Sequence, residues 1–124
     1  MAKKMPASVK RVCFDFNWSN KKVWELNVKT EKMPISKLEW HFYLPFFKAY
    51  TLKAIDVIER PGLHRKEYQR TMRANLRHPI DIMRNKGRWL ILDGLHRLAK
   101  AKIRGMTEVN VRKIPRSMIA RIEP

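Results

Sequence analysis

The sequence predicts an α+β fold, with a small mixed β-sheet and helices packed against it. One observation behind this is the last third of the chain, where two apolar strands around a tight turn precede an amphipathic helix and an alternating strand. Another is that 124 residues, 44% of them hydrophobic, suffice for one core. We expect residues 1–12 to form a basic tail that could be mobile. Residues 13–124 are expected to form a single domain with its core in residues 34–115.

The segment after the tail predicts a β-hairpin over residues 13–28. Its two arms alternate apolar with polar side chains on either side of a Ser-Asn-Lys turn. The apolar positions are Phe14, Phe16 and Trp18 in the first arm, and Trp24, Leu26 and Val28 in the second. Residues 30–33 are expected to be a polar link that ends at Pro34.

The middle of the chain predicts a short strand and then two helices. The strand is expected in the bulky apolar segment 35–44, which Pro45 interrupts. Thr51 can cap a short helix over residues 52–60. A second helix is expected over residues 64–76, where apolar residues recur every four positions and the other faces are basic.

A strand-turn-strand-helix-strand unit is the clearest pattern in the chain. Its continuous apolar run Trp-Leu-Ile-Leu is typical of a buried central strand, and Gly105 suits the C-terminal cap of its helix. The expected elements are a strand at 80–82, a hairpin turn at 84–87, the central strand at 89–92, a helix that begins after Gly94, and a strand at 109–112.

Charge is the strongest bulk feature. The chain has 28 Lys and Arg against 11 Asp and Glu, a net charge of +17, so we expect nucleic acid or another polyanion as partner. A generally basic surface without such a partner is the alternative. No run of eighteen apolar residues predicts a membrane span, and no apolar stretch of a secretory signal follows the basic N-terminus. Because Cys13 is the single cysteine, no internal disulfide is possible, and we expect a cytoplasmic protein.

Asp93-Gly94-Leu95-His96-Arg97 joins the apolar strand to the helix that follows it. Backbone N–H groups are unpaired at a helix start, and glycine lets a ligand approach the backbone, so an anion is stabilised there. Arg97 offers a planar fork for phosphate oxygens, and His96 a donor that titrates near neutral pH. The pattern predicts a phosphate-binding corner. Alternatively, Asp93 only caps the helix and His96 packs on its surface. Arg97 would then pair with Asp81 or Glu108.

Residues 78–114 resemble the core of the ParB/sulfiredoxin superfamily. The features that carry the resemblance are Pro79-Ile80, Gly94-Leu95-His96-Arg97, Ala99, Gly105 and Val109-Asn110-Val111. The resemblance covers residues 63–115 well and residues 34–44 loosely, and it leaves the N-terminal hairpin as an addition. It implies a ParB/sulfiredoxin-like fold whose corner binds nucleotide phosphates.

Departures from the family narrow what the resemblance implies. Sulfiredoxins carry a reactive cysteine where this chain has Leu95, so sulfiredoxin chemistry is not expected. ParB proteins bind CTP with two arginines after a glutamate, where this chain has Leu95-His96-Arg97. They also need a helix-turn-helix domain, for which only residues 116–124 remain. The resemblance therefore implies a stand-alone ParB-like N-terminal or nuclease-type domain.

The implied cofactor is a nucleoside triphosphate, ATP or CTP. The residues implied to hold it are Gly94, Leu95, His96 and Arg97 of the corner, with Arg65 and Lys66 on the preceding helix. We expect a nucleotide-phosphate-binding domain that acts on or next to nucleic acid. A non-catalytic DNA- or RNA-binding protein is one alternative.

An enzyme is the other alternative, either a nucleotide-dependent phosphotransferase (or NTPase) or a ParB-like nuclease. Asp93 and His96 are its candidate catalytic residues, and Asp81 with Asp93 could hold Mg²⁺ through carboxylate oxygens. Glu67 and Glu39 are further candidates for a general base. The four histidines have no zinc-site spacing. The tryptophans are expected in the core, with a stacking platform for bases as the alternative.

Overall fold

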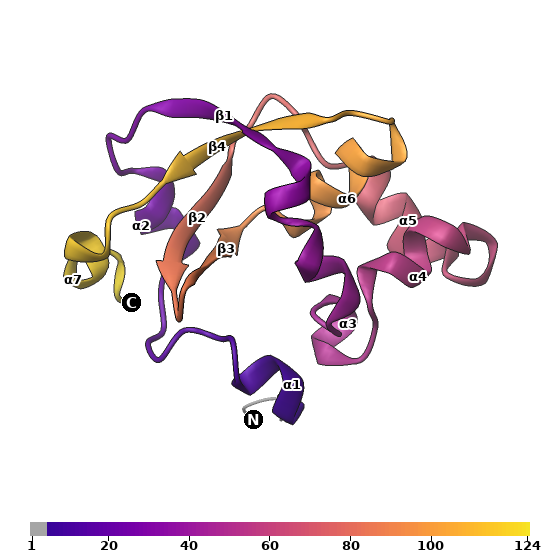
Figure 1. Cartoon of the computed structure of the whole chain (residues 1–124), viewed down its shortest axis with the longest axis horizontal. Helices are drawn as coiled ribbons and strands as arrows, with labels where there is room; N and C mark the ends of the chain where they lie inside the picture. Colours follow the sequence, from indigo (N-terminus) through magenta and orange to yellow (C-terminus); the bar gives the residue numbers. More distant parts are fainter. Residues whose placement is uncertain (1–4) are drawn as a thin grey trace.

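The computed structural model describes residues 5–124 and contains one four-stranded mixed sheet with helices around it (Figure 1). The strands are β1 (Thr30–Pro34), β2 (Ile80–Asn85), β3 (Arg88–Asp93) and β4 (Glu108–Lys113). Their order is β1-β4-β2-β3. The β4–β2 pair is parallel, and the two outer pairs are antiparallel. The predicted α+β class with a mixed sheet is confirmed.

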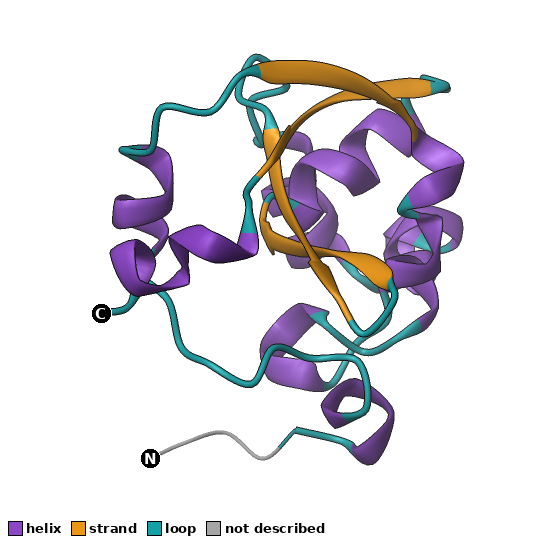
Figure 2. Ribbon diagram, turned by 60° about the vertical axis from the view of Figure 1, so that its left-hand side comes forward, coloured by secondary structure: helices purple, strands orange, loops and turns teal. Residues whose placement is uncertain are grey.

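The helices are short and lie on both sides of this strongly twisted sheet (Figure 2). The α-helices are α1 (Ala7–Lys10), α2 (Asn20–Trp24), α3 (Phe47–Tyr50), α4 (Ala54–Glu59), α5 (Arg65–Met72), α6 (Leu95–Ile103) and α7 (Ile119–Ile122). The 3₁₀-helices are η1 (Ile35–Lys37), η2 (Glu39–Tyr43), η3 (Pro61–Leu63) and η4 (Arg116–Met118). In the part of the chain that the structure describes, no helix has the length and apolar character needed to span a membrane.

Two apolar clusters hold the elements together, one on each side of the sheet. The first joins the middle of the chain and α6 to β2 and β4, with Phe42, Ile82, Leu98 and Val111 essentially inaccessible to solvent. The second joins the N- and C-terminal segments to β2 and β3. Figure 1 accordingly has α3 to α6 on one side of the sheet and α2 and α7 on the other. The terminal segments are therefore part of the domain core.

The C-terminal unit contains the elements that its pattern predicts. Lys86 and Gly87 both have positive φ (51° and 80°) in the two-residue turn between β2 and β3, as a tight hairpin requires. Gly105, with φ of 74°, follows the C-terminus of α6. The predicted position of residues 89–92 is wrong, however, because β3 is an edge strand and β2 is the strand whose side chains are almost all buried.

β3 looks like a central strand in the sequence because both of its faces are covered. Leu90 and Leu92 belong to the second cluster, while Trp89 and Ile91 pack against the first. Its outer edge is also occupied, since the Ile91 N–H donates to Nε2 of His41 (3.1 Å). An apolar run therefore indicates burial on two faces and does not identify the strand's neighbours.

The predicted hairpin over residues 13–28 is not formed. Ser19 instead caps α2, its Oγ accepting a hydrogen bond from the Lys22 N–H (3.3 Å). Val23 and Leu26 are the buried residues of α2 and of the turn that follows it, and their spacing of three suits a helical turn. Trp24, expected on the same face as Leu26, is 56% exposed. The helical spacing of Val23 and Leu26 and the Ser19 cap therefore outweigh the alternation of apolar and polar residues that predicted a hairpin.

Residues 30–44 also differ from expectation. The predicted polar link is β1, an edge strand on which only Met33 is buried. The predicted strand over residues 35–44 is a pair of 3₁₀-helices. Ile35, Leu38 and Phe42 are the buried apolar side chains there, and their spacing of three and four is helical.

Smaller differences concern the tail and the two middle helices. Residues 1–4 lie outside the described residues, but Val9 in α1 is fully buried, so the predicted tail packs against the domain from there. Thr51 does not cap α4, which begins at Ala54 after Lys53. Its hydroxyl donates instead to the Lys48 carbonyl (2.6 Å). The helix expected over residues 64–76 is shorter, since α5 ends at Met72.

Candidate functional site

The corner between β3 and α6 is built around Gly94. Gly94 is the N-cap residue of α6 with φ of 119°, and no side chain caps this helix start within the described part of the chain. A Cβ at this position would lie 3.0 Å from Nη1 of Arg97 and 3.2 Å from the Ile80 backbone. Both the backbone angle and the close packing therefore require glycine.

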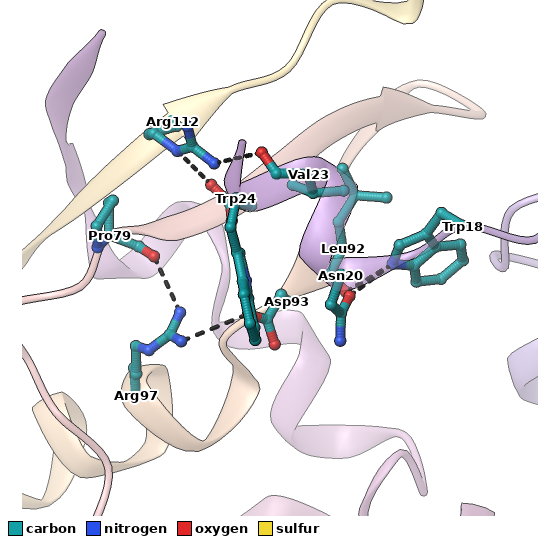
Figure 3. Close-up of polar contacts among 10 residues, drawn as sticks. Trp18, Asn20, Val23, Trp24, Pro79, Leu92, Asp93, Arg97 and Arg112 are labelled. Carbon is teal, nitrogen blue, oxygen red and sulfur yellow. Dashed lines mark hydrogen bonds and ion pairs between the residues drawn. The ribbon is translucent and has the colours of Figure 1, made fainter. Parts of the chain in front are cut away.

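Asp93 does not cap α6 and instead links the corner to α2. Its Oδ2 accepts a hydrogen bond from Nε1 of Trp24 (2.8 Å) and pairs with Nη2 of Arg97 (3.4 Å) (Figure 3). Nothing in the sequence indicates this contact, because the two residues are 69 positions apart. Both contacts engage Oδ2, so this carboxylate oxygen holds Trp24 and Arg97 in place at the corner.

Arg97 is also engaged by the protein. Its Nη1 donates to the Pro79 carbonyl (3.0 Å), which ties the start of β2 to α6 (Figure 3). Arg97 forms a salt bridge, as one of the alternatives expected. Its partner, however, is Asp93, and neither Asp81 nor Glu108 pairs with Arg97. With only 17% of the side chain exposed, Arg97 primarily positions the corner.

Asp81 is buried in an ion pair with Arg112, whose Nε lies 2.6 Å from Oδ1 of Asp81. The same guanidinium donates to the carbonyls of Leu26 and Val23 at the end of α2. Burial raises the pKa of the Asp81 carboxyl, and the Arg112 guanidinium opposes that rise. This network anchors the N-terminal segment to β4 and engages Oδ1 of Asp81.

The two carboxylates predicted to hold Mg²⁺ are cross-strand neighbours, since Asp81 pairs with Asp93 in the β2–β3 register. Each is nevertheless bound to its own arginine. Within residues 5–124, no group of three or more His, Cys, Asp or Glu side chains is arranged to hold a metal ion. The geometry favours a site that binds its ligand through cations and backbone groups.

A cavity of about 650 Å³ opens in front of the corner. It is lined on one side by Gly94, Leu95, His96 and Arg97, as the sequence predicts, and on the other by cations and polar groups at the end of α5. Those groups are Arg70, Arg73, Asn75 and His78. Arg65 and Lys66 do not line the cavity, because the cations that do so lie one to two turns further along the same helix.

The far end of the cavity is aromatic and aliphatic. The side chains there come from the N-terminal segment, η2, α3 and β3, and they include Phe14, Trp18, Phe46, Leu90 and Leu92. Phe14 and Trp18 pack edge to face with ring centroids 5.2 Å apart. One cavity thus combines a cationic end with an apolar end, and its volume is in the range usual for small-molecule sites.

His96 is held in a fixed orientation at the cavity wall. Its Nε2 lies 2.9 Å from Oε2 of Glu67, and its ring stacks on Phe47 at 4.4 Å. Glu67 comes from α5 and His96 from α6, so their contact joins the two helices that flank the cavity. A carboxylate that orients an imidazole is a common arrangement for proton transfer.

Residues 48–50 form a strained loop at the same wall. Lys48, Ala49 and Tyr50 have φ of 52°, 59° and 66°, which is unfavourable for three consecutive residues with side chains. Paired hydrogen bonds between Phe47 and Leu52 (2.9 and 3.0 Å) close the loop. It brings Ala49 and Tyr50 to the cavity, which the sequence did not indicate.

His41 and Cys13 also line the cavity. His41 is buried, its Nδ1 bonding the Leu38 carbonyl (2.8 Å) while its Nε2 accepts the Ile91 N–H (3.1 Å). Burial lowers the pKa of His41 to about 4, so the imidazole is neutral at pH 7. Burial also raises the pKa of the Cys13 thiol, which makes it less reactive.

Glu39 is remote from this cavity. It binds Nζ of Lys102 at 2.6 Å, which raises the pKa of that lysine. The geometry therefore gives no support to Glu39 as a general base at the corner.

In comparisons with protein-family models, with curated proteins and with solved structures, no match to this chain was found.

Proposed function

We propose that the protein binds a nucleotide in the cavity at the β3–α6 corner, with the phosphates at the cationic end. The observation that carries the proposal is the convergence on one cavity of the uncapped start of α6 and the arginines of α5. Backbone N–H groups at a helix start favour anions, and arginine forks match phosphate oxygens. The resemblance to ParB/sulfiredoxin-like domains, which use this corner for nucleotide phosphates, supports the same proposal.

The roles within the corner differ from those expected. Arg70 and Arg73 are exposed on the cavity side of α5 and serve as the phosphate contacts. Arg97, already bonded to Pro79 and Asp93, keeps the backbone of the corner in place. The nucleobase occupies the apolar end, beside Phe14 and Trp18, where an aromatic ring loses little by desolvation.

An enzymatic role is the second candidate, and the Glu67–His96 contact favours it. Glu67 orients His96 at the cavity wall, so His96 could move a proton between a substrate hydroxyl or water and the bound phosphates. Glu67→Gln should then lower turnover and change its pH profile while nucleotide affinity stays within a factor of about three. Unchanged turnover in that variant would remove the dyad from the mechanism.

A titration with fluorescent ATP and CTP analogues tests the proposal. Arg70→Ala/Arg73→Ala removes two cavity cations, and Arg65→Ala/Lys66→Ala removes two cations from the same helix outside the cavity. We expect the first variant to lose binding by on the order of 100-fold, because each charge-assisted contact contributes about 1.5 kcal/mol or more. The second should bind nearly as the wild type does.

Equal losses in both variants would mean that only overall charge matters, and the proposed site would be wrong. The same conclusion would follow if the Arg65/Lys66 variant alone lost affinity, since those cations do not line the cavity. All four side chains are exposed, so we expect each variant to keep its fold. Circular dichroism of each variant checks this.

A further inference from the structure

We propose that a second, separate groove binds single-stranded nucleic acid. The groove has a volume of about 500 Å³ and lies where all four strands meet η1 and η2. Five cations line it: Lys32, Lys37, Arg84, Arg88 and Lys113. The inference goes beyond the proposed nucleotide site, and it assigns the polyanion expected from the net charge of +17 a surface distinct from the nucleotide cavity.

Electrostatics favours a polyanion in this groove. Lys113 pairs with Glu31 (3.0 Å), whereas the other four lining cations make no ion pair among the described residues. None of the carboxylates in residues 5–124 lines the groove. The cations extend from β1 to β3, which at the usual strand spacing is a width of about 14 Å. That spread suits an extended chain of phosphates better than a single phosphate group.

Two tryptophans hold the cations in fixed positions. Arg84 lies over the ring of Trp89 (5.2 Å) and Arg88 over the ring of Trp40 (4.9 Å). Lys113 also lies over Trp89, at 5.3 Å. Cation–π contacts at these distances restrain flexible side chains, so less entropy is lost when they bind a ligand.

The arrangement also offers flat surfaces for bases. His41 stacks on Trp40 (3.8 Å), so the ring that supports Arg88 is itself fixed. Unpaired bases stack on guanidinium planes as well as on aromatic rings, and Arg84 and Arg88, each supported by a tryptophan ring, present such planes. An acidic protein segment would use the charges without the planes. Single-stranded DNA or RNA therefore fits the groove better than an acidic peptide does.

The hairpin brings these groups together. Arg84 and Trp89 are cross-strand partners at the tight turn, and Arg88 follows Gly87 directly. The two arginines thus lie on either side of the tight turn that joins β2 to β3. Such placement fixes both guanidinium groups relative to the tryptophans.

Fluorescence anisotropy with labelled single-stranded DNA and RNA oligonucleotides tests the inference. The test variant is Arg84→Glu/Arg88→Glu, and Arg60→Glu/Arg65→Glu is the matched control. The control arginines lie near the α4–α5 connection, at the opposite end of the molecule from the β2–β3 turn (Figure 1). Two lost phosphate contacts should weaken binding by at least about 25-fold at 0.1 M salt and reduce the salt slope by about 1.4. The control should change affinity by less than threefold.

Three further ligands test whether the groove prefers single-stranded nucleic acid, and one further variant tests whether it is independent of the nucleotide cavity. An abasic sugar-phosphate oligomer should bind at least about fivefold more weakly than the same length of DNA, because stacking contributes about 1 kcal/mol or more per base. Poly-glutamate and duplex DNA should also bind more weakly than single strands. Arg70→Ala/Arg73→Ala should leave oligonucleotide binding unchanged, so that failure of the nucleotide site and failure of the groove are distinguishable.

The inference is overturned by any of three results. Equal weakening in both charge-reversal variants would mean that binding follows net charge alone. Poly-glutamate that binds as tightly as the oligonucleotides would point to an acidic protein instead. Absence of oligonucleotide binding by the wild type would leave the groove without the proposed ligand. If the charge reversals unfold the protein, Arg84→Gln/Arg88→Gln should still lower affinity at least about 25-fold.

Discussion

Acidification should destabilise the protein through His41. In the folded protein, Nε2 of His41 accepts the Ile91 N–H and Nδ1 bonds the Leu38 carbonyl, so the ring cannot take a second proton without losing a hydrogen bond. Burial lowers its pKa from 6.5 to about 4. The unfolded chain therefore binds this proton more readily, and the stability that neutral His41 contributes is lost as the pH falls from 6.5 through 4.

The size of the effect follows from the two pKa values. Between pH 7 and pH 5, the free energy of unfolding should fall by about 2 kcal/mol through His41 alone. That is a large share of the total stability of a small domain, which is typically about 5–15 kcal/mol. The contact also matters for the site, because His41 holds the outer edge of β3 next to the cavity.

Urea unfolding at pH 7 and pH 5, followed by tryptophan fluorescence, measures this effect. His41→Gln is the comparison, since its amide oxygen can still accept a hydrogen bond but does not titrate. The variant should be less stable at pH 7 and should lose about 2 kcal/mol less than the wild type on acidification. Equal losses in both proteins, or an NMR titration midpoint for His41 above 6, would refute the reasoning.

Two further predictions concern the structure around the corner. Arg112→Met should lower the free energy of unfolding by about 3–5 kcal/mol in urea titrations, because it leaves Asp81 buried without its partner, and adding Asp81→Asn should recover part of that loss. A loss below about 1 kcal/mol would contradict the claim that Arg112 compensates the buried charge of Asp81. Gly94→Ala should lower the melting temperature by several degrees, because alanine is strained at φ of 119° and its Cβ would meet Arg97. Gly62→Ala, where nothing lies within 4 Å, should have little effect, and similar shifts in both variants would refute the role of Gly94.

The C-terminal half of the fold could be predicted because its patterns are locally consistent. The glycines at positions 87, 94 and 105 all have positive φ where the turn, helix start and helix end were expected. The β2–β3 hairpin, α6 and β4 therefore follow from neighbouring residues alone. The N-terminal half could not be predicted in this way, because alternation and helical spacing compete there. Leu26 fits both patterns, and its burial beside Val23, together with the Ser19 cap, decides for the helix.

The candidate site was predictable in place but not in detail. The sequence identified the corner from Gly94 to Arg97, which does line the main cavity. It could not identify Trp24 as the partner of Asp93 or Glu67 as the partner of His96, because these contacts join distant segments. The α5 cations that line this cavity lie one to two turns beyond Arg65 and Lys66, since a helix basic on several faces does not indicate which face lines a cavity.

The central claim, a nucleotide in the corner cavity, is tested most directly by a thermal-shift panel. ATP, ADP, CTP and GTP are added with and without Mg²⁺ to the wild type, to Arg70→Ala/Arg73→Ala and to Arg65→Ala/Lys66→Ala. A nucleotide at a hundred times its dissociation constant should stabilise the wild type by about 2.7 kcal/mol, a shift of several degrees. We predict that the Arg70/Arg73 variant loses this shift and that the Arg65/Lys66 variant keeps it. No shift with any of the four nucleotides, or a shift that both variants retain, would contradict the proposed site.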